Sequence, residues 1–295
     1  MVSYIGGKST IGKWIKDYIP TDIKTYVEPF SGAYWVYFNL DIEKFENLEN
    51  VIYNDFNPVN SNLFNCLRTP EEFYEFIKNE TCQTKSIDLS GTSCDKEFSD
   101  KFYRYQKSAF DESRKFDVNN PDFQWAMEYV YVLTQVFSGS KPETAKFIDL
   151  KHKYRSKFDT FRDKVAGIGQ GKKYPSMLKK ITNVENMDFE DVIKKYDSED
   201  TYIYLDPPYW KTENYYSNHD FDRNDHERLA KCLKTTKAKW SLSYYHFDLL
   251  EEWFPKDEYV WREKDFAKSA SAKSGLKQNM GTELLIMNYD IEKSI

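Results

Sequence analysis

The feature that most constrains this fold is an apolar run that ends in a rigid polar tetrapeptide. Residues 201–205 read TYIYL, and Asp206-Pro207-Pro208-Tyr209 follow at once. A short apolar run bounded by a turn signal is consistent with a strand buried on both faces, as in a parallel sheet. Two prolines fix φ and remove two N–H donors, so nearby carbonyls stay free to accept hydrogen bonds. We expect the carboxyl end of this strand to present a carboxylate, a free carbonyl and an aromatic ring.

A strand-turn-helix rhythm occurs on both flanks of the chain. It predicts a parallel α/β sheet domain built from residues 1–70 and 181–295, and a mostly helical insert at 71–180. The elements of the rhythm are strands at 25–30 and 51–56, a helix at about 58–68, the segment ITNVENMDF, the strand at 201–205, a helix at about 225–234, a strand at 239–245, a short helix ending at Pro255, and the strands EYVWRE and ELLIMNY. About 19 residues (264–282) are expected to connect the last two strands. So long a connection is more often functional or mobile than structural.

The first residues contain a glycine pair and a lysine, Gly6-Gly7-Lys8, ahead of a predicted helix. A phosphate-binding P-loop would need glycine at position 2, where Val2 stands. Apolar residues with helical spacing follow, and we expect Ser9 or Thr10 to cap this helix and Pro20 to end it. A helix N-terminus opened by glycines suits an anionic group. The spaced apolar residues are Ile11, Trp14, Ile15, Tyr18 and Ile19.

Charge is distributed unevenly along the chain. Residues 141–180 hold 12 Lys and Arg against 4 Asp and Glu, a local net charge of +8. The net charge of the whole chain is −6, so the remaining residues together carry −14. An acidic body with one basic segment fits a protein that touches a polyanion over a limited surface, although a solvated helical face has the same pattern. The four cysteines form no C-x-x-C pair, no apolar run approaches the roughly 20 residues of a membrane span, and no signal peptide is seen. We expect a cytoplasmic protein without a metal site.

Five segments, in this order, resemble the motifs of the D12, Dam-like class of N6-adenine DNA methyltransferases. They are SYIGGK, VEPFSGAYWV, NDFN (54–57), MDF (187–189) and the D-P-P-Y tetrapeptide. The chain departs from the class at Tyr34, where a second glycine is common, and it lacks the F-N-x-P-x-G hairpin, for which FSGSKPETAKF (137–147) stands instead. The resemblance implies a Rossmann-like S-adenosylmethionine-dependent sheet with a helical inserted target-recognition domain. It also implies double-stranded DNA as substrate, a companion restriction endonuclease as a candidate partner, and a monomer or weak dimer.

The resemblance also implies roles for individual residues. Asp206 and the Pro207 carbonyl would accept the two N6–H bonds of an adenine swung out of the duplex, and Tyr209 would stack on it. Asp55 would bridge the cofactor ribose, and Asp188 would accept from the cofactor adenine, cap the helix that begins at Phe189, or do both. The predicted catalytic residues are Asp206, Pro207, Pro208 and Tyr209. The predicted cofactor-binding residues are Tyr4, Gly6, Gly7, Lys8, Glu28, Pro29, Phe30, Ser31, Gly32, Asp55, Asp188, Phe189 and Asp206. The predicted DNA-binding residues are Lys151, Lys153, Arg155, Lys157, Lys268 and Lys273.

Structural explanations compete with two of these roles, since Phe30 could be a core residue and Asp55 part of an exposed turn. For Lys8 two functional partners are open, the cofactor carboxylate and a target phosphate. At the level of function, the alternatives are N4-cytosine methylation, an RNA or free-base substrate, and a catalytically silent DNA-binding regulator on the same fold. N-P-P-Y enzymes that act on glutamine side chains are disfavoured, because Asp stands at position 206.

Overall fold

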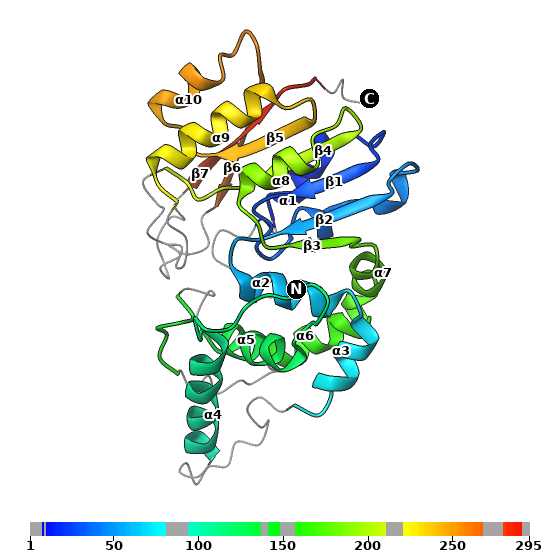
Figure 1. The fold of residues 1–295 in the computed structure, drawn as a ribbon, viewed down its shortest axis with the longest axis vertical. Coiled ribbons are helices and arrows are strands. Elements are labelled where there is room, and N and C mark those ends of the chain that lie inside the picture. Colours follow the sequence, from blue (N-terminus) through cyan, green and yellow to red (C-terminus); the bar gives the residue numbers. More distant parts are fainter. Residues whose placement is uncertain are drawn as a thin grey trace. The chain divides into compact units, whose positions relative to one another are not determined.

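The computed structural model describes residue 8 and residues 10–80, 94–136, 141–147, 157–210, 221–267 and 280–290. Seven strands form a mixed sheet in the order β3-β2-β1-β4-β5-β7-β6 (Figure 1). Their bounds are β1 Thr25–Glu28, β2 Asn50–Asn54, β3 Asn183–Glu185, β4 Thr201–Leu205, β5 Lys239–Tyr244, β6 Val260–Ala267 and β7 Met280–Met287. The contacts divide the chain into two compact units, one within residues 57–186 and one formed by residues 8–56 with the chain from Met187 onward.

The second unit contains the parallel strands that the rhythm predicts. β1 pairs in parallel with β2 and with β4, and β4 pairs in parallel with β5. β7 then runs antiparallel between β5 and β6. The predicted α/β class is therefore confirmed, and the sheet is mixed because its last two strands reverse direction.

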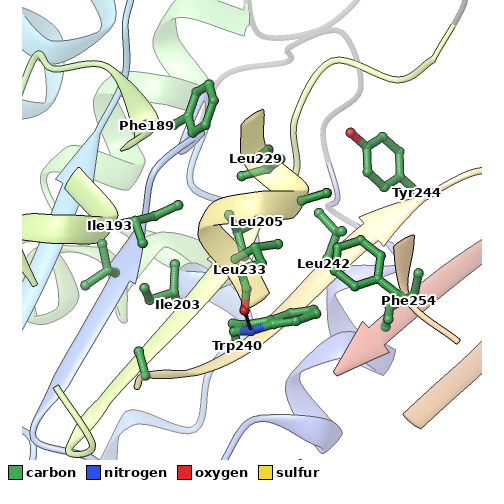
Figure 2. Close-up of a cluster of buried hydrophobic side chains, with 14 of the residues drawn as sticks. Phe189, Ile193, Ile203, Leu205, Leu229, Leu233, Trp240, Leu242, Tyr244 and Phe254 are labelled. Atoms are coloured by element: carbon green, nitrogen blue, oxygen red, sulfur yellow. Dashed lines mark hydrogen bonds between the residues drawn. The ribbon is translucent and has the colours of Figure 1, made fainter. Parts of the chain in front are cut away.

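A hydrophobic core lies between this sheet and helices α8 (Phe189–Lys195) and α9 (Arg223–Thr235). Trp240 of β5 belongs to this core and is fully buried (Figure 2). Its indole N–H donates to the Leu233 carbonyl of α9 at 2.9 Å, the dashed line in Figure 2. This bond satisfies the only polar group of the ring, so Trp240 stabilises the core through its full apolar area.

Tyrosines in the buried strand β4 have hydroxyl partners on the neighbouring strand. Tyr202 and Tyr204 are buried, and their hydroxyls bond Ser241 and Ser243 of β5 at 2.5 and 2.8 Å. The alternation of serine in KWSLSY is thus explained by the tyrosines opposite, since a buried hydroxyl without a partner is costly. This pairing lets a tyrosine-rich strand occupy the middle of a sheet.

The unit within residues 57–186 is mostly helical. Its helices are α2 Pro58–Leu67, α3 Pro70–Ile77, α4 Cys94–Ala109, α5 Phe123–Gln135, α6 Lys157–Val165 and α7 Tyr174–Lys179. α5 is central, because all of its residues from Trp125 onward are buried. Asp122 caps its start by accepting from the Trp125 amide at 2.9 Å. Within the described ranges, no helix is long and apolar enough to cross a membrane.

Two local predictions are wrong. The first helix is short, α1 Gly12–Ile15 followed by a 3₁₀ turn η1 Lys16–Tyr18, and its N-cap is Ile11 without a side-chain bond. Thr10 is therefore not the cap, and Ser9 lies outside the described residues. The Lys8 carbonyl accepts from the Gly12 amide at 2.7 Å instead, so the turn is closed by backbone.

The predicted connection at 264–282 is too long. β6 continues to Ala267 and β7 begins at Met280, where these two residues are register partners. Thr282 donates to Asp265 across the pair at 2.7 Å. Polar side chains that pair across the two strands, such as Asp265 and Thr282, extend the hairpin. The composition of this stretch, rich in Lys, Ser, Ala and Gly, predicts a loop instead.

Candidate active site

The D-P-P-Y tetrapeptide lies directly after β4, at the sheet edge where the parallel strands end. β1 and β2 end at the same edge with Glu28 and Asn54, and the antiparallel β7 starts there, which brings Glu283 to it. The Asp206 side chain is 19% exposed. Tyr209 is buried. The tetrapeptide therefore places a reachable carboxylate beside a fixed ring, as predicted for the carboxyl edge of a parallel sheet.

Lys8 lies at the centre of this group. Its ammonium Nζ is 2.9 Å from Asp206 Oδ1, 2.5 Å from the Tyr209 hydroxyl and 3.2 Å from Glu283 Oε1. The Tyr209 hydroxyl donates to Glu283 Oε1 at 2.5 Å. The Lys8 and Glu283 side chains are 9% and 1% exposed. One buried cation is therefore shared by two carboxylates and a phenol, which we call the Lys8 cluster (Lys8, Asp206, Tyr209 and Glu283).

Burial raises the pKa of the Asp206 carboxyl to about 6. Lys8 opposes the rise by favouring the carboxylate, and Glu283 adds to it by like-charge repulsion. Asp206 is therefore mostly ionised at neutral pH, yet more basic than an ordinary aspartate. Such a carboxylate is a strong hydrogen-bond acceptor for an N–H group.

The turn after β1 is held in a left-handed conformation at two residues. Gly32 has φ 48° and Tyr34 has φ 58°. The carboxylate of Asp55, just beyond β2, accepts from the Gly32 amide at 3.0 Å. The Tyr53 hydroxyl donates to the Gly32 carbonyl at 2.8 Å. Tyr34 thus keeps a backbone conformation that favours glycine, so its departure from the expected motif does not change the hand of the turn.

Glu28, at the end of β1, is tied inward. It accepts from the Tyr26 hydroxyl at 2.6 Å and from the Tyr37 amide at 3.1 Å, and it is 2% exposed. Burial raises its pKa well above the ordinary value, against the effect of these two hydrogen bonds. The bonds shown for Glu28 are structural, and its contact with a cofactor stays a prediction.

Asn54, at the end of β2, joins two of the predicted motifs. Its amide donates to the Pro29 carbonyl at 2.8 Å and to the Met187 carbonyl at 3.1 Å, and its Oδ1 accepts from the Met187 amide at 2.9 Å. The side chain is fully buried. Asn54 therefore fixes the turn after β1 against the segment that begins α8.

Asp188 and Phe189 lie beside an arginine and two further rings. Asp188 caps α8, accepting from the Glu190 amide at 2.9 Å, which confirms the capping interpretation. Both of its oxygens also pair with Arg228, at 2.7 and 2.9 Å. The Arg228 guanidinium lies 4.2 Å from the centre of the Phe189 ring. Phe30 and Phe221, both partly exposed, contact Phe189 at centroid distances of 5.4 and 5.8 Å.

A match to a protein family identifies the activity of the chain. Residues 4–267 match the family model of the D12 class N6 adenine-specific DNA methyltransferases. The chain belongs to this family. It is an S-adenosylmethionine-dependent enzyme that methylates N6 of adenine in DNA.

Two relatives are similar to the methyltransferase over almost its whole length. It is 23% identical to the type II methyltransferase M.CviBI of Paramecium bursaria Chlorella virus NC1A, over 98% of this chain and 99% of the relative. It is 25% identical to the type II methyltransferase M1.LlaDCHI of Lactococcus lactis subsp. cremoris, over 97% of this chain and 94% of the relative.

The residues at this edge fit the adenosyl cofactor that the family uses. Asp55 supplies a carboxylate beside the turn, and Phe30, Phe189 and Phe221 supply aromatic surface for a purine. Of the other predicted residues of the turn, Ser31 is fixed by its side chain, since its Oγ donates to the Glu28 carbonyl at 2.7 Å. A polar tip next to partly exposed rings matches the two halves of an adenosine.

Several predicted residues of the methyltransferase cannot be placed. Tyr4, Gly6, Gly7, Lys151, Lys153, Arg155, Lys268 and Lys273 lie outside the described residues. Lys157 begins α6 and is exposed. Its contact with DNA stays a prediction.

Three residues of the site are not predicted from the sequence. They are Asn54, which links two motifs, Arg228, which pairs with Asp188, and Glu283 of the Lys8 cluster. Asn54 carried a signal, because an amide at the end of a buried strand must find partners. Glu283 carried a signal too, because it is an acidic residue directly before the apolar run LLIM. Arg228 sits on an amphipathic helix rich in charges and carried none.

Proposed function

We propose that this methyltransferase acts through the D-P-P-Y tetrapeptide on an adenine flipped out of the duplex. Asp206 and the Pro207 carbonyl accept the two N6–H bonds and aim the nitrogen lone pair at the methyl group, which the cofactor supplies as a sulfonium. The amino nitrogen is delocalised into the ring, so positioning and stabilisation of its developing positive charge account for the catalysis. The observation that supports this most is the Asp206 carboxylate at the sheet edge, with its pKa raised to about 6 and Tyr209 fixed beside it.

The residues proposed to bind the cofactor lie at the same edge of the sheet. Asp55 accepts from the ribose hydroxyls, and Phe30 and Phe189 pack on the adenine. Asp188 already holds Arg228 with both oxygens, so its bond to the cofactor amino group uses the lone pairs that remain on them. Lys8 is assigned to the catalytic carboxylate, because its ammonium lies 2.9 Å from Asp206 Oδ1.

We further propose that the unit within residues 57–186 contains the target-recognition function and that the basic segment at 141–180 contacts phosphates. The relatives named type II methyltransferases support a site-specific enzyme that works beside a restriction endonuclease. Phosphate contacts would give orientation on the duplex, and the recognition sequence would be read by other side chains.

The test is methylation of unmethylated genomic DNA with isotopically labelled S-adenosylmethionine, followed by nucleoside analysis. We expect N6-methyladenine from the wild type and none from Asp206→Ala, which should keep its thermal melting temperature and its cofactor affinity by calorimetry. Label in N4-methylcytosine, or substantial turnover by Asp206→Ala, would contradict the proposal. Sequencing the product DNA would then give the recognition site.

A further inference from the structure

Glu283 is a buried acid that the proposed mechanism leaves without a role. It lies at the start of β7, directly before residues whose side chains pack into the core. Side chains alternate along a strand, so Leu284 and Ile286 face that core while Glu283 faces the opposite side of the sheet. A carboxylate that is 1% exposed is costly unless it is paired, and its partners Tyr209 and Lys8 both belong to the methyl-transfer site.

The charges of the Lys8 cluster do not cancel. Lys8 contributes +1, and Asp206 and Glu283 contribute −1 each when they are ionised, which leaves −1. Without Glu283, Lys8 and Asp206 would form a neutral pair. The methyl transfer develops positive charge on the amino nitrogen, and a neutral pair would stabilise that charge far less than a net anion does.

We propose that Glu283 is a positioning residue of the methyl-transfer site, which holds the Tyr209 hydroxyl and offsets the charge of Lys8 so that Asp206 meets the target amino group as an uncompensated carboxylate. This inference rests on the proposed role of Asp206. It assigns to β7 a part in the reaction that the D-P-P-Y motif alone does not suggest.

The geometry gives Glu283 two separate effects. Its Oε1 accepts from the Tyr209 hydroxyl at 2.5 Å, which fixes the ring next to the amino-group acceptors. The same oxygen lies 3.2 Å from the Lys8 ammonium, which sits 2.9 Å from Asp206 Oδ1. Lys8 is thereby held between two acids, and the repulsion between Glu283 and Asp206 partly offsets the attraction of Lys8 for Asp206.

Glu283→Gln separates these effects, because the glutamine carbonyl can still accept from Tyr209 while the charge is lost. Among the described residues, six groups interact electrostatically with Asp206. They are Lys8 before α1, Glu28 of β1, Tyr204 of β4, Tyr209 after β4, Tyr245 after β5 and Glu283 of β7. Of these, only Glu283 changes in the variant. Removing a negative neighbour favours the Asp206 carboxylate, so its pKa falls.

The experiment measures kcat/KM on unmethylated genomic DNA between pH 5 and 8, together with the single-turnover rate at saturating cofactor. For Glu283→Gln we expect a single-turnover rate lower by about tenfold or more, an unchanged cofactor dissociation constant, and an acid limb moved to lower pH. Glu263→Gln is the matched control, since Glu263 is an exposed acid on the neighbouring strand β6, and it should leave rate and profile unchanged.

A second comparison keeps the test decisive if Glu283→Gln folds poorly. Lys8→Met and Lys8→Met/Glu283→Gln remove one or both members of the buried pair, and the double variant leaves Asp206 as a lone carboxylate. We expect the acid limb of the double variant to lie below that of Lys8→Met, again because one negative neighbour is gone. An unchanged rate and acid limb on removal of Glu283 in either background would overturn the inference. If Asp206→Ala keeps its turnover, the proposed function fails, whatever Glu283 does.

Discussion

At the scale of single residues, the proposed mechanism depends on a carboxylate, Asp206, that is partly buried and yet ionised. Asp206 has its pKa raised to about 6 by burial, and Lys8 limits the rise. A group with a raised pKa loses its proton only as the pH passes that value, so the acceptor form of Asp206 is scarce below pH 6 and dominant above it.

We therefore predict that kcat/KM rises about tenfold per pH unit below the pKa of about 6 and levels off above it. The pH dependence of kcat/KM reports groups of the free enzyme, so its midpoint can be compared directly with the pKa of about 6 for Asp206. A profile measured from pH 5 to 8 checks this. A flat profile across pH 6, with the protein still folded by circular dichroism, would show that Asp206 titrates elsewhere.

Arg228 is the second residue that single-site changes can test. Its two nitrogens hold both oxygens of Asp188, and lysine cannot reproduce this bidentate geometry. We predict that Arg228→Lys weakens cofactor binding several-fold, because Asp188 loses its fixed orientation. Arg223→Lys, an exposed arginine on the same helix α9, serves as control. Calorimetric titration with the cofactor measures both, and equal affinities for the two variants would exclude a role for Asp188 in binding.

At the scale of elements, the turns between strands set the geometry of the site. Tyr34 holds φ 58°, a conformation that costs an ordinary residue about 1 kcal/mol or more. Its ring is fully buried, stacks on Tyr37 with centroids 4.6 Å apart, and its hydroxyl donates to the Ile52 carbonyl at 3.1 Å. Packing thus maintains a turn that glycine would form without strain.

We predict that Tyr34→Gly lowers the free energy of unfolding by about 2–4 kcal/mol, because removing a buried aromatic ring costs more than the relieved strain. Tyr34→Phe keeps the ring and should lose only about 1 kcal/mol, the value of one hydrogen bond. Urea unfolding of both variants is the measurement. A Tyr34→Gly variant as stable as the wild type would mean that the backbone strain, and not the ring, dominates.

The strand β2 gives a further prediction, at Asn54. Asn54→Ala leaves the Pro29 carbonyl and the Met187 backbone without their partner, so we expect a loss of about 1–3 kcal/mol in stability and weaker cofactor binding. Asn50→Ala, at the other end of β2 with one 3.4 Å contact to Thr25, should change neither by much. Equal effects of the two substitutions would argue that Asn54 does not link the motifs.

At the scale of the whole molecule, the charge distribution predicts how DNA binding responds to salt. The segment 141–180 carries +8 and the rest of the chain −14, so contact with phosphates should be confined to a small surface. Each neutralised phosphate releases counterions, and we predict that DNA affinity falls steeply between 50 and 200 mM salt. Fluorescence anisotropy with labelled duplex DNA measures it. An affinity that stays flat over this range would contradict a phosphate-tracking role for the basic segment.

The sequence by itself determined the order of strands and helices, the α/β class, and the residues of the D-P-P-Y edge. Strands such as TYIYL and helices such as 225–234 follow from periodicity and turn residues, which are local properties. The cap of the first helix and the length of the β6–β7 hairpin were predicted wrongly, because backbone closure at Lys8 and cross-strand pairs such as Asp265 with Thr282 depend on the folded chain.

Only the tertiary structure decided which charges meet. Lys8, Asp206 and Glu283 are far apart in the sequence, and the fold brings the two carboxylates within hydrogen-bond reach of Lys8 at one edge of the sheet. The antiparallel direction of β7 is the reason, because it places the start of that strand where β4 ends. A motif shows which groups are available for chemistry, but the free energy of a buried charge depends on its neighbours, and folding selects those neighbours from distant parts of the chain.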